Sequence, residues 1–217
     1  MSAKDKHKED LNYARENYDR GELLESKIDK DPVQQFSSWF AVAANSDVRE
    51  ANAMILASSN SKGQPSARVV LMRDFSNEGF VFYTNYNSRK GRDLIANPQA
   101  ALLFFWDELE RQIRIEGQVE KVSKEQSDAY FNNRPADSRA ASISSNQSST
   151  VDSRKELQEN YKRVKESGDL SRPDHWGGFI VRPHRFEFWQ GRPARLHDRI
   201  VYRLGEDGKW DIDRLAP

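Results

Sequence analysis

Cysteine is absent from this chain of 217 residues. A disulfide framework, a thiolate nucleophile and a cysteine-ligated metal centre are therefore excluded. Net charge is missing as well, because 34 Lys and Arg residues balance 34 Asp and Glu residues. Domains that bind nucleic acid through its phosphates are usually basic overall, so this balance argues against nucleic acid as a partner.

The sequence also lacks long apolar runs. No stretch approaches the ~20 apolar residues that a membrane-spanning helix needs, and the first residues lack the apolar core of a signal peptide. We therefore expect a cytoplasmic protein with no membrane partner. Glycine-rich phosphate loops, the serine-hydrolase motif and metal-binding histidine pairs are missing too, which argues against a metalloenzyme and against a serine hydrolase.

Charge dominates the first 30 residues, which hold few apolar side chains. Such a segment buries too little surface to fix its own fold, and we predict a mobile N-terminal arm over residues 1–30. A single domain is expected over residues 31–217, since one core can serve a chain of this length. It is expected to open with a helix, because Asp31 and Pro32 have the pattern of an N-cap followed by a first-turn proline.

Short apolar runs separated by turn residues follow from Asn52 onward. They predict strands near residues 53–57, 67–72, 80–84, 101–106, 112–120, 178–190 and 199–204. Further helices are predicted near residues 88–97, 123–133 and 151–167, with a polar stretch at 134–150 before the last. Because the strands follow one another across tight turns, the pattern favours a mainly β fold, an antiparallel barrel with peripheral helices, over a parallel βαβ architecture.

Two clusters of basic residues stand out from this neutral background. Six arginines lie within residues 180–203, and five basic residues lie within residues 68–92, with Tyr83 and Trp189 among the aromatic residues beside them. Arginine binds phosphate with two hydrogen bonds and an aromatic face covers a flat ring, so a phosphorylated planar heterocycle is favoured as ligand. A plainer alternative stays open, with arginines paired to carboxylates, Trp189 in the core and His197 a structural histidine.

A longer motif goes further than composition. The run Phe186–Gln190, followed by Arg195–Arg199, resembles the signature of the pyridoxamine 5′-phosphate oxidase family. Similar segments occur in the same order at Arg68–Arg73, Phe82–Asn85, Ser88–Lys90, Glu110–Gln112, Tyr130–Phe131, Arg134 with Ser138, Gln147–Ser148 and Trp210–Pro217. The resemblance covers most of the chain from about Arg15 onward.

This resemblance implies a split β-barrel over residues 31–217 that binds FMN at the interface of a homodimer. It also implies oxidation of pyridoxamine 5′-phosphate or pyridoxine 5′-phosphate to pyridoxal 5′-phosphate, by hydride transfer from the substrate C4′ carbon to flavin N5. O2 would be reduced to H2O2, and ammonia would be released from the amine substrate. The expected place of the reaction is vitamin B6 biosynthesis and salvage.

The resemblance also assigns residues to the site, position by position. In one subunit, FMN would be bound by Arg68, Val69, Val70, Leu71, Met72, Arg73, Tyr83, Thr84, Arg89, Lys90 and Gln112. The partner subunit would complete the FMN site with Gln147, Ser148, Trp189 and Arg199. The substrate phosphate would be bound by Arg73, Tyr130, Arg134 and Ser138. Arg195 and His197 would be the catalytic pair over the substrate ring, and Arg15 and Tyr18 match an arm position that covers the site.

The sequence departs from the family pattern in two places. Arg73 occupies a position that is commonly lysine, and arginine is not interchangeable with lysine at a fitted phosphate site. The stretch 139–143 lacks the glycine and the aromatic residue that some relatives have there. The first departure bears on substrate affinity and the second on the conformation of the segment.

Two other classes of function remain open from the sequence. A non-catalytic split-barrel protein that only binds flavin or pyridoxal phosphate would share the fold, although the presence of Arg195 and His197 argues against it. Single-stranded nucleic-acid binding would use the same aromatic and basic residue types. The zero net charge makes it the weaker alternative.

Overall fold

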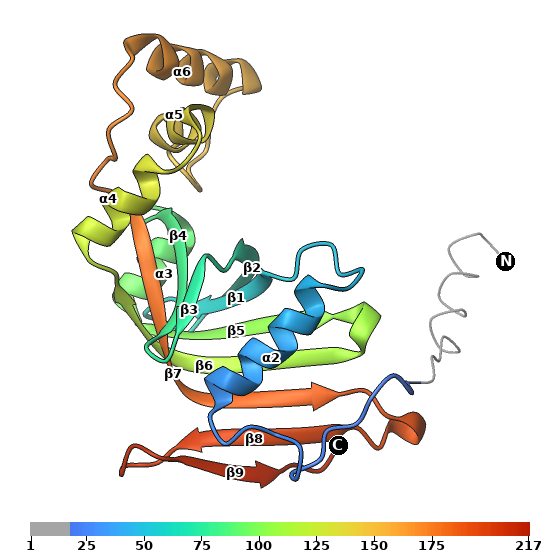
Figure 1. Ribbon diagram of the computed structural model, residues 1–217. Coiled ribbons are helices and arrows are strands. Elements are labelled where there is room, and N and C mark those ends of the chain that lie inside the picture. The colour runs from blue at the N-terminus through green and yellow to red at the C-terminus, as the bar shows by residue number, and fades with distance from the viewer. Residues whose placement is uncertain (1–17) are drawn as a thin grey trace, which may run out of the picture.

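The computed structural model describes residues 18–217, and in that part of the chain nine strands form one antiparallel sheet curled into a half-barrel (Figure 1). The strands are β1 (Ala53–Ser59), β2 (Pro65–Leu71), β3 (Asp74–Ser76), β4 (Gly79–Asn85), β5 (Gln99–Trp106), β6 (Arg111–Lys121), β7 (Trp176–Gln190), β8 (Asp198–Leu204) and β9 (Trp210–Arg214). Their order is β2-β1-β5-β6-β7-β4-β3, and β8 pairs with β7 and β9. The predicted mainly β, antiparallel fold is confirmed.

The helices lie around this sheet. They are α2 (Pro32–Ala44), α3 (Arg89–Ala96), α4 (Lys124–Asn132), α5 (Ala136–Ser144) and α6 (Arg154–Ser167), with short 3₁₀ turns η1 (Asp107–Leu109) and η2 (Pro193–Arg195). The cap predicted at Asp31 is confirmed, because its carboxylate accepts from the Val33 N–H. At the start of α4, the Ser123 hydroxyl accepts from the Gln126 N–H in the same way. Among the described residues, no helix has the length and apolar character needed to cross a membrane.

The long strand β7 connects the two halves of the sheet. Its first residues pair with β4, and its last residues pair with β8, while β6 runs alongside most of its length. The pairing with β6 shifts register between Glu116 and Gly117, where a side chain at Gly117 would collide with the Arg182 carbonyl. In Figure 1 the strand turns sharply, so that α4 and β8 lie at opposite ends of it.

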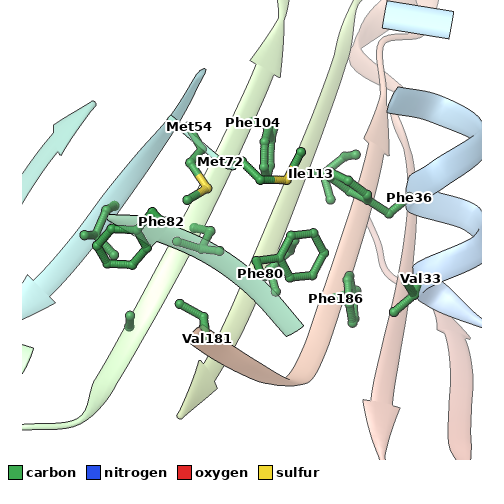
Figure 2. Close-up of a cluster of buried hydrophobic side chains, with 14 of the residues drawn as sticks. Val33, Phe36, Met54, Met72, Phe80, Phe82, Phe104, Ile113, Val181 and Phe186 are labelled. Atoms are coloured by element: carbon green, nitrogen blue, oxygen red, sulfur yellow. The ribbon is translucent and has the colours of Figure 1, made fainter. Parts of the chain in front are cut away.

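An aromatic core holds α2 against the sheet. Phe36 is fully buried, and its ring packs edge-on against Phe80 and Phe104 at centroid distances of 4.8 and 5.1 Å. Figure 2 shows Phe36 and Val33 pointing from the helix toward this cluster of strand side chains. Edge-to-face contacts between rings add to the free energy of burial, so this cluster stabilises α2 against the sheet.

Three elements were not predicted, for physical reasons. Helix α5 lies in the stretch predicted only as polar, has no side-chain cap and buries only Ala140, so its sequence carries little helical signal. Strand β3 has only three residues, which lie between the strands predicted at 67–72 and 80–84. Strand β9 pairs with β8 alone and is only partly buried, so it lacks the apolar run of an inner strand.

The predicted arm lies partly outside the described residues. Within residues 18–30, Leu23 is buried and its N–H donates to the Asp198 carboxylate at 3.0 Å. Arg214 donates to the Glu25 carboxylate at 2.6 and 2.8 Å and to the Leu23 carbonyl at 2.8 Å. These bonds attach residues 18–30 to the C-terminal strands, and the mobility of residues 1–30 stays a prediction.

Candidate active site

A cleft of about 300 Å³ opens where β2, β4, α3 and α4 meet. It is lined by Arg68, Val69, Val70, Leu71, Arg73, Tyr83, Thr84, Lys90, Tyr130, Arg134, Gln147 and Trp176. An adjoining hollow of about 350 Å³ shares five of these residues and adds Ser138. The fold therefore gathers most of the residues that the sequence assigned to FMN and to the substrate phosphate.

One group of cations in the cleft comes from β2 and the first turn of α3. Arg68 donates to the Ser58 and Ser66 hydroxyls at 2.8 Å each, and Lys90 Nζ lies 3.2 Å from the Thr84 hydroxyl. Burial lowers the pKa of Arg68, and burial together with the charge of Arg68 lowers the pKa of Lys90. Charges that repel one another in a partly buried place are suited to hold an anion.

A second group of cations lies in the same cleft beside α4. Burial lowers the pKa of Arg134, and the charge of Arg73 lowers it further, so the two guanidinium groups act on each other. The Tyr130 ring stacks on the Tyr83 ring at a centroid distance of 3.7 Å, and both rings line the cleft. Within the described residues, neither Arg73 nor Arg134 has a carboxylate within 4.0 Å, whereas Arg172 and others elsewhere are paired.

A third group lies at the far end of β7. Gln112, Trp189 and Arg199 stand side by side across β6, β7 and β8 through their strand register. The His197 ring lies 4.7 Å from the Trp189 ring, and Tyr18 approaches both rings edge-on. In the part of the chain that the structure describes, none of these residues lines the cleft. The cleft lies at the start of β7, where Trp176 lines it, and the third group lies at the other end of this strand.

Arg195 stands on an exposed and strained turn in this third group. Its φ is +61°, and that of Ala194 is +56°, a region that residues other than glycine rarely adopt. The next residue, Leu196, is 70% exposed. Strain of this kind costs of order 1–3 kcal/mol and tends to persist at functional sites. The turn therefore exposes Arg195 to solvent, outside the cleft of its own chain.

Arg199 is already bonded within its own chain. Its Nε and Nη2 donate to one oxygen of the Glu187 carboxylate at 2.9 and 2.7 Å, and its Nη1 donates to the Ala216 carbonyl at 2.8 Å. Burial alone would raise the pKa of Glu187, but hydrogen bonds from Arg199 and Arg185 bring it below its ordinary value. An Arg199 held in this way offers its two remaining N–H donors and its flat face to a ligand.

Several expected residues lie elsewhere than the sequence suggested. Gln147 was expected to act from the partner subunit, yet its side-chain oxygen lies 3.0 Å from the Thr84 hydroxyl of the same chain. Met72 is buried in the core, so its side chain does not line the cleft. Ser148 has a φ of +72° in the loop after Gln147. Arg15 lies outside the described residues.

The residues of the two hollows that were not assigned to the site from the sequence are Asn85, Ala141, Ser142, Ser145 and Trp176. Trp176 lines both hollows and lies under the Arg134 guanidinium, 4.7 Å from it, and Ser142 accepts a hydrogen bond from Arg134 at 2.7 Å. Neither Trp176 nor Ser142 carries a charge or belongs to a segment that resembled the family signature. The only available signal was that Trp176 is an aromatic residue just before the strand predicted at 178–190.

Comparison with known proteins assigns two parts of the chain to two family models. Residues 42–168 match the family model described as pyridoxamine 5′-phosphate oxidase, and residues 176–217 match the C-terminal dimerisation region of pyridoxine 5′-phosphate oxidase. The chain belongs to the pyridoxamine 5′-phosphate oxidase family. The resemblance found in the sequence is confirmed, and membership makes the chain an oxidoreductase.

Individual relatives agree over nearly the full length. The pyridoxine/pyridoxamine 5′-phosphate oxidase of Bordetella petrii is 54% identical over 205 residues, 94% of this chain and 97% of the relative. That of Trichormus variabilis is 51% identical over 206 residues, 94% and 96% of the two chains. The crystal structure of PhzG from Burkholderia lata, in complex with tetrahydrophenazine-1-carboxylic acid, has a TM-score of 0.85 and 31% identity over 90% of this chain and 98% of that one.

A more distant structure supports the fold. A pyridoxamine 5′-phosphate oxidase-related, FMN-binding protein from Nostoc punctiforme has a TM-score of 0.69 with 16% identity, over 86% of this chain and 98% of that chain. Together with PhzG it confirms the split-barrel architecture expected from the sequence.

The protonation of His197 is testable. Burial lowers the pKa of His197, and the charge of Arg195 lowers it further. We expect the NMR titration of its ring to have a midpoint below the ordinary value of ~6.5. Arg195→Ala is expected to raise that midpoint, because removing a nearby positive charge favours the imidazolium form. A midpoint unaffected by the substitution would contradict the effect of the Arg195 charge on the His197 ring.

Proposed function

We propose that this chain is an FMN-dependent oxidase that converts pyridoxamine 5′-phosphate or pyridoxine 5′-phosphate to pyridoxal 5′-phosphate, with O2 as electron acceptor. The observation that supports this most is the pair of cation groups in one cleft, with Arg68 and Lys90 on one side and Arg73 and Arg134 on the other. Two phosphorylated molecules bound side by side need two such groups. The relatives are named pyridoxine/pyridoxamine 5′-phosphate oxidases, which supports these two substrates. The proposed reaction would belong to vitamin B6 biosynthesis and salvage.

The residues present fit FMN. Arg68 and Lys90 offer charged donors to a phosphate, and Arg89 adds its charge nearby. The chain supplies no thiol, and within the described residues it holds no cluster of metal ligands, so the redox chemistry needs a cofactor. When bound, FMN supplies a two-electron acceptor that O2 can reoxidise. The protein residues bind the two phosphates and align the rings.

We propose that the site is completed by a second copy of the chain. Arg195 and His197 lie at the far end of β7 from the cleft in their own chain, within the region that matches the family's dimerisation region. In a homodimer, the strained turn of one subunit would reach the cleft of the other. Arg195 is permanently cationic, so its role is to orient the substrate and stabilise charge and not to accept a proton.

His197 has a defined tautomer for this role. Its Nδ1 lies 3.1 Å from the backbone N–H of Arg192, which can only donate, so Nδ1 must be the acceptor. The proton of the neutral ring therefore sits on Nε2. We propose that Nε2 donates a hydrogen bond to the ring hydroxyl of the substrate, which orients the substrate ring against the flavin.

The function is tested by the visible spectrum of the protein loaded with FMN. Anaerobic addition of pyridoxine 5′-phosphate is expected to bleach the flavin, and admission of air is expected to restore its colour with formation of aldehyde and H2O2. A protein that holds FMN without bleaching would be a carrier and would overturn the proposal. Tetrahydrophenazine-1-carboxylic acid, the compound bound in the PhzG structure, is tested in parallel, and its oxidation in place of pyridoxine 5′-phosphate would overturn the proposed substrate class.

Lys90→Met is expected to weaken FMN binding by about 10- to 100-fold, because a charged hydrogen bond to phosphate is lost while the apolar stem is kept. Flavin fluorescence during titration measures the Kd. Lys62→Met is the matched control, since Lys62 is exposed on the turn between β1 and β2 and lines neither hollow. Equal affinities of the two variants would show that Lys90 does not contact the FMN phosphate.

A further inference from the structure

Arg134 is held on two sides. The Trp176 ring covers the face of its guanidinium at 4.7 Å, and the Ser142 hydroxyl accepts a hydrogen bond from its Nη1 at 2.7 Å. The same hydroxyl donates to the Ser138 carbonyl at 3.0 Å. Ser142 therefore uses both its donor and its acceptor capacity and connects two residues that we assign to the substrate phosphate.

This double contact answers a physical problem in the cleft. Arg134 is partly buried and lies within reach of the Arg73 charge, and within the described residues no carboxylate compensates it. Repulsion between the two cations would favour conformations in which Arg134 swings out toward water. The cation–π contact with Trp176 and the hydrogen bond from Arg134 to Ser142 hold the guanidinium in place and use only one of its five N–H donors.

We infer that Ser142 is a positioning residue for substrate binding, which holds the Arg134 guanidinium in the cleft so that its free donors meet the substrate phosphate on arrival. This inference rests on the proposed function, in which Arg134 binds that phosphate. Fixing a flexible side chain before binding reduces the ordering cost that binding would otherwise include. Ser142 lies in the stretch 139–143, where the sequence departs from the family pattern.

Helix α5 offers a clean comparison. Ser142→Ala removes only the hydroxyl, and alanine is the stronger helix former, so α5 is expected to keep its fold. Ser144 lies on the same helix, but its hydroxyl bonds only to the Ala141 carbonyl at 3.3 Å, and it lines neither hollow. Ser144→Ala is therefore the matched control. Ser142→Thr keeps the hydroxyl and tests for rescue.

The experiment measures steady-state kinetics and inhibition by inorganic phosphate in the FMN-loaded protein. For Ser142→Ala we expect the KM for pyridoxine 5′-phosphate and the Ki for phosphate to rise about 5- to 10-fold, as for the loss of one hydrogen bond to a charged group. The value of kcat and the Kd for FMN are expected to change less than twofold. Ser144→Ala is expected to behave as wild type, and Ser142→Thr to recover most of the affinity.

Each contrary result has a defined meaning. Unchanged KM and Ki in Ser142→Ala, or equal losses in Ser144→Ala, would overturn the positioning role. A weakened FMN affinity would show that the hydroxyl supports the fold of the whole cleft. If the wild-type protein does not oxidise pyridoxine 5′-phosphate, the proposed function fails. Direct titration with inorganic phosphate, followed by flavin fluorescence, then still decides whether Ser142 holds Arg134 ready for an anion.

Discussion

Arg195→Ala is expected to lower kcat by about 10²- to 10³-fold while FMN remains bound, the size found when one preorganised charge at a reacting centre is removed. The exposed turn with a φ of +61° at Arg195 places no part of this side chain in the cleft of its own chain. Its loss should therefore spare the cation group that we assign to the FMN phosphate. Stopped-flow measurement of flavin reduction separates this step from reoxidation by O2.

Arg203→Ala provides the control for this prediction. Arg203 belongs to the same arginine-rich segment, but it is exposed and paired with Asp213 at 2.6 Å on the outer strands. Its removal is expected to change kcat by less than twofold, because exposed ion pairs contribute little. Loss of flavin from the Arg195 variant, or an equal loss of turnover in the Arg203 variant, would mean that Arg195 has another role.

The sequence predicts the inner strands well because their burial requires a regular alternation of apolar and polar residues. In β6, buried Ile113 and Ile115 alternate with more exposed neighbours, which is the pattern of a strand with one face in the core. The helix that follows Ser123 is also readily predicted, because its N-cap bond joins residues three positions apart in the sequence. Helix α5 depends on contacts with α6, which lies farther along the chain, so no local signal predicts it.

The meeting of the two cation groups could not be derived from spacing alone. Tyr83 and Thr84 lie opposite Gly178 and Gly177 through the pairing of β4 with β7. Helix α4 also packs on β7, which brings Arg134 near Arg68 and Tyr83, residues that precede it by 66 and 51 positions. The two basic clusters of the sequence predicted a phosphate ligand. The prediction placed residues 68–92 and 180–203 in one site, and in the fold of a single chain these segments lie apart. The cleft includes no residue of the 180–203 cluster.

Because the cleft and the 180–203 cluster lie apart in one chain, we expect each site to combine residues from two subunits. The 180–203 arginines that have carboxylate partners, such as Arg185 and Arg199 with Glu187, form a network on the face of β7 and β8. That network orders the end of the sheet that carries His197 and Arg195. The proposed arrangement combines the cleft of one chain with the Arg195 turn of another, and it requires that both copies fold and associate before either site can work.

Mixed dimers test this arrangement directly. Arg134→Ala should raise KM about 10- to 100-fold by removing charged donors to the substrate phosphate, and Arg195→Ala should lower kcat, so each parent has a strongly reduced kcat/KM. Random exchange of subunits makes half of the dimers mixed, and each mixed dimer has one cleft with both groups intact. We expect the mixture to regain about a quarter of the wild-type kcat/KM.

The matched control mixes two variants of the same cleft. Arg73→Ala and Arg134→Ala lie in one chain's cation group, so every cleft in their mixed dimers keeps one defect and no recovery is expected. Differently tagged subunits, purified in tandem, show that mixed dimers have formed. Recovery in the control as well would mean that Arg73 and Arg134 of one site come from different subunits. No recovery in either mixture would mean that Arg195 and Arg134 of one site come from the same subunit.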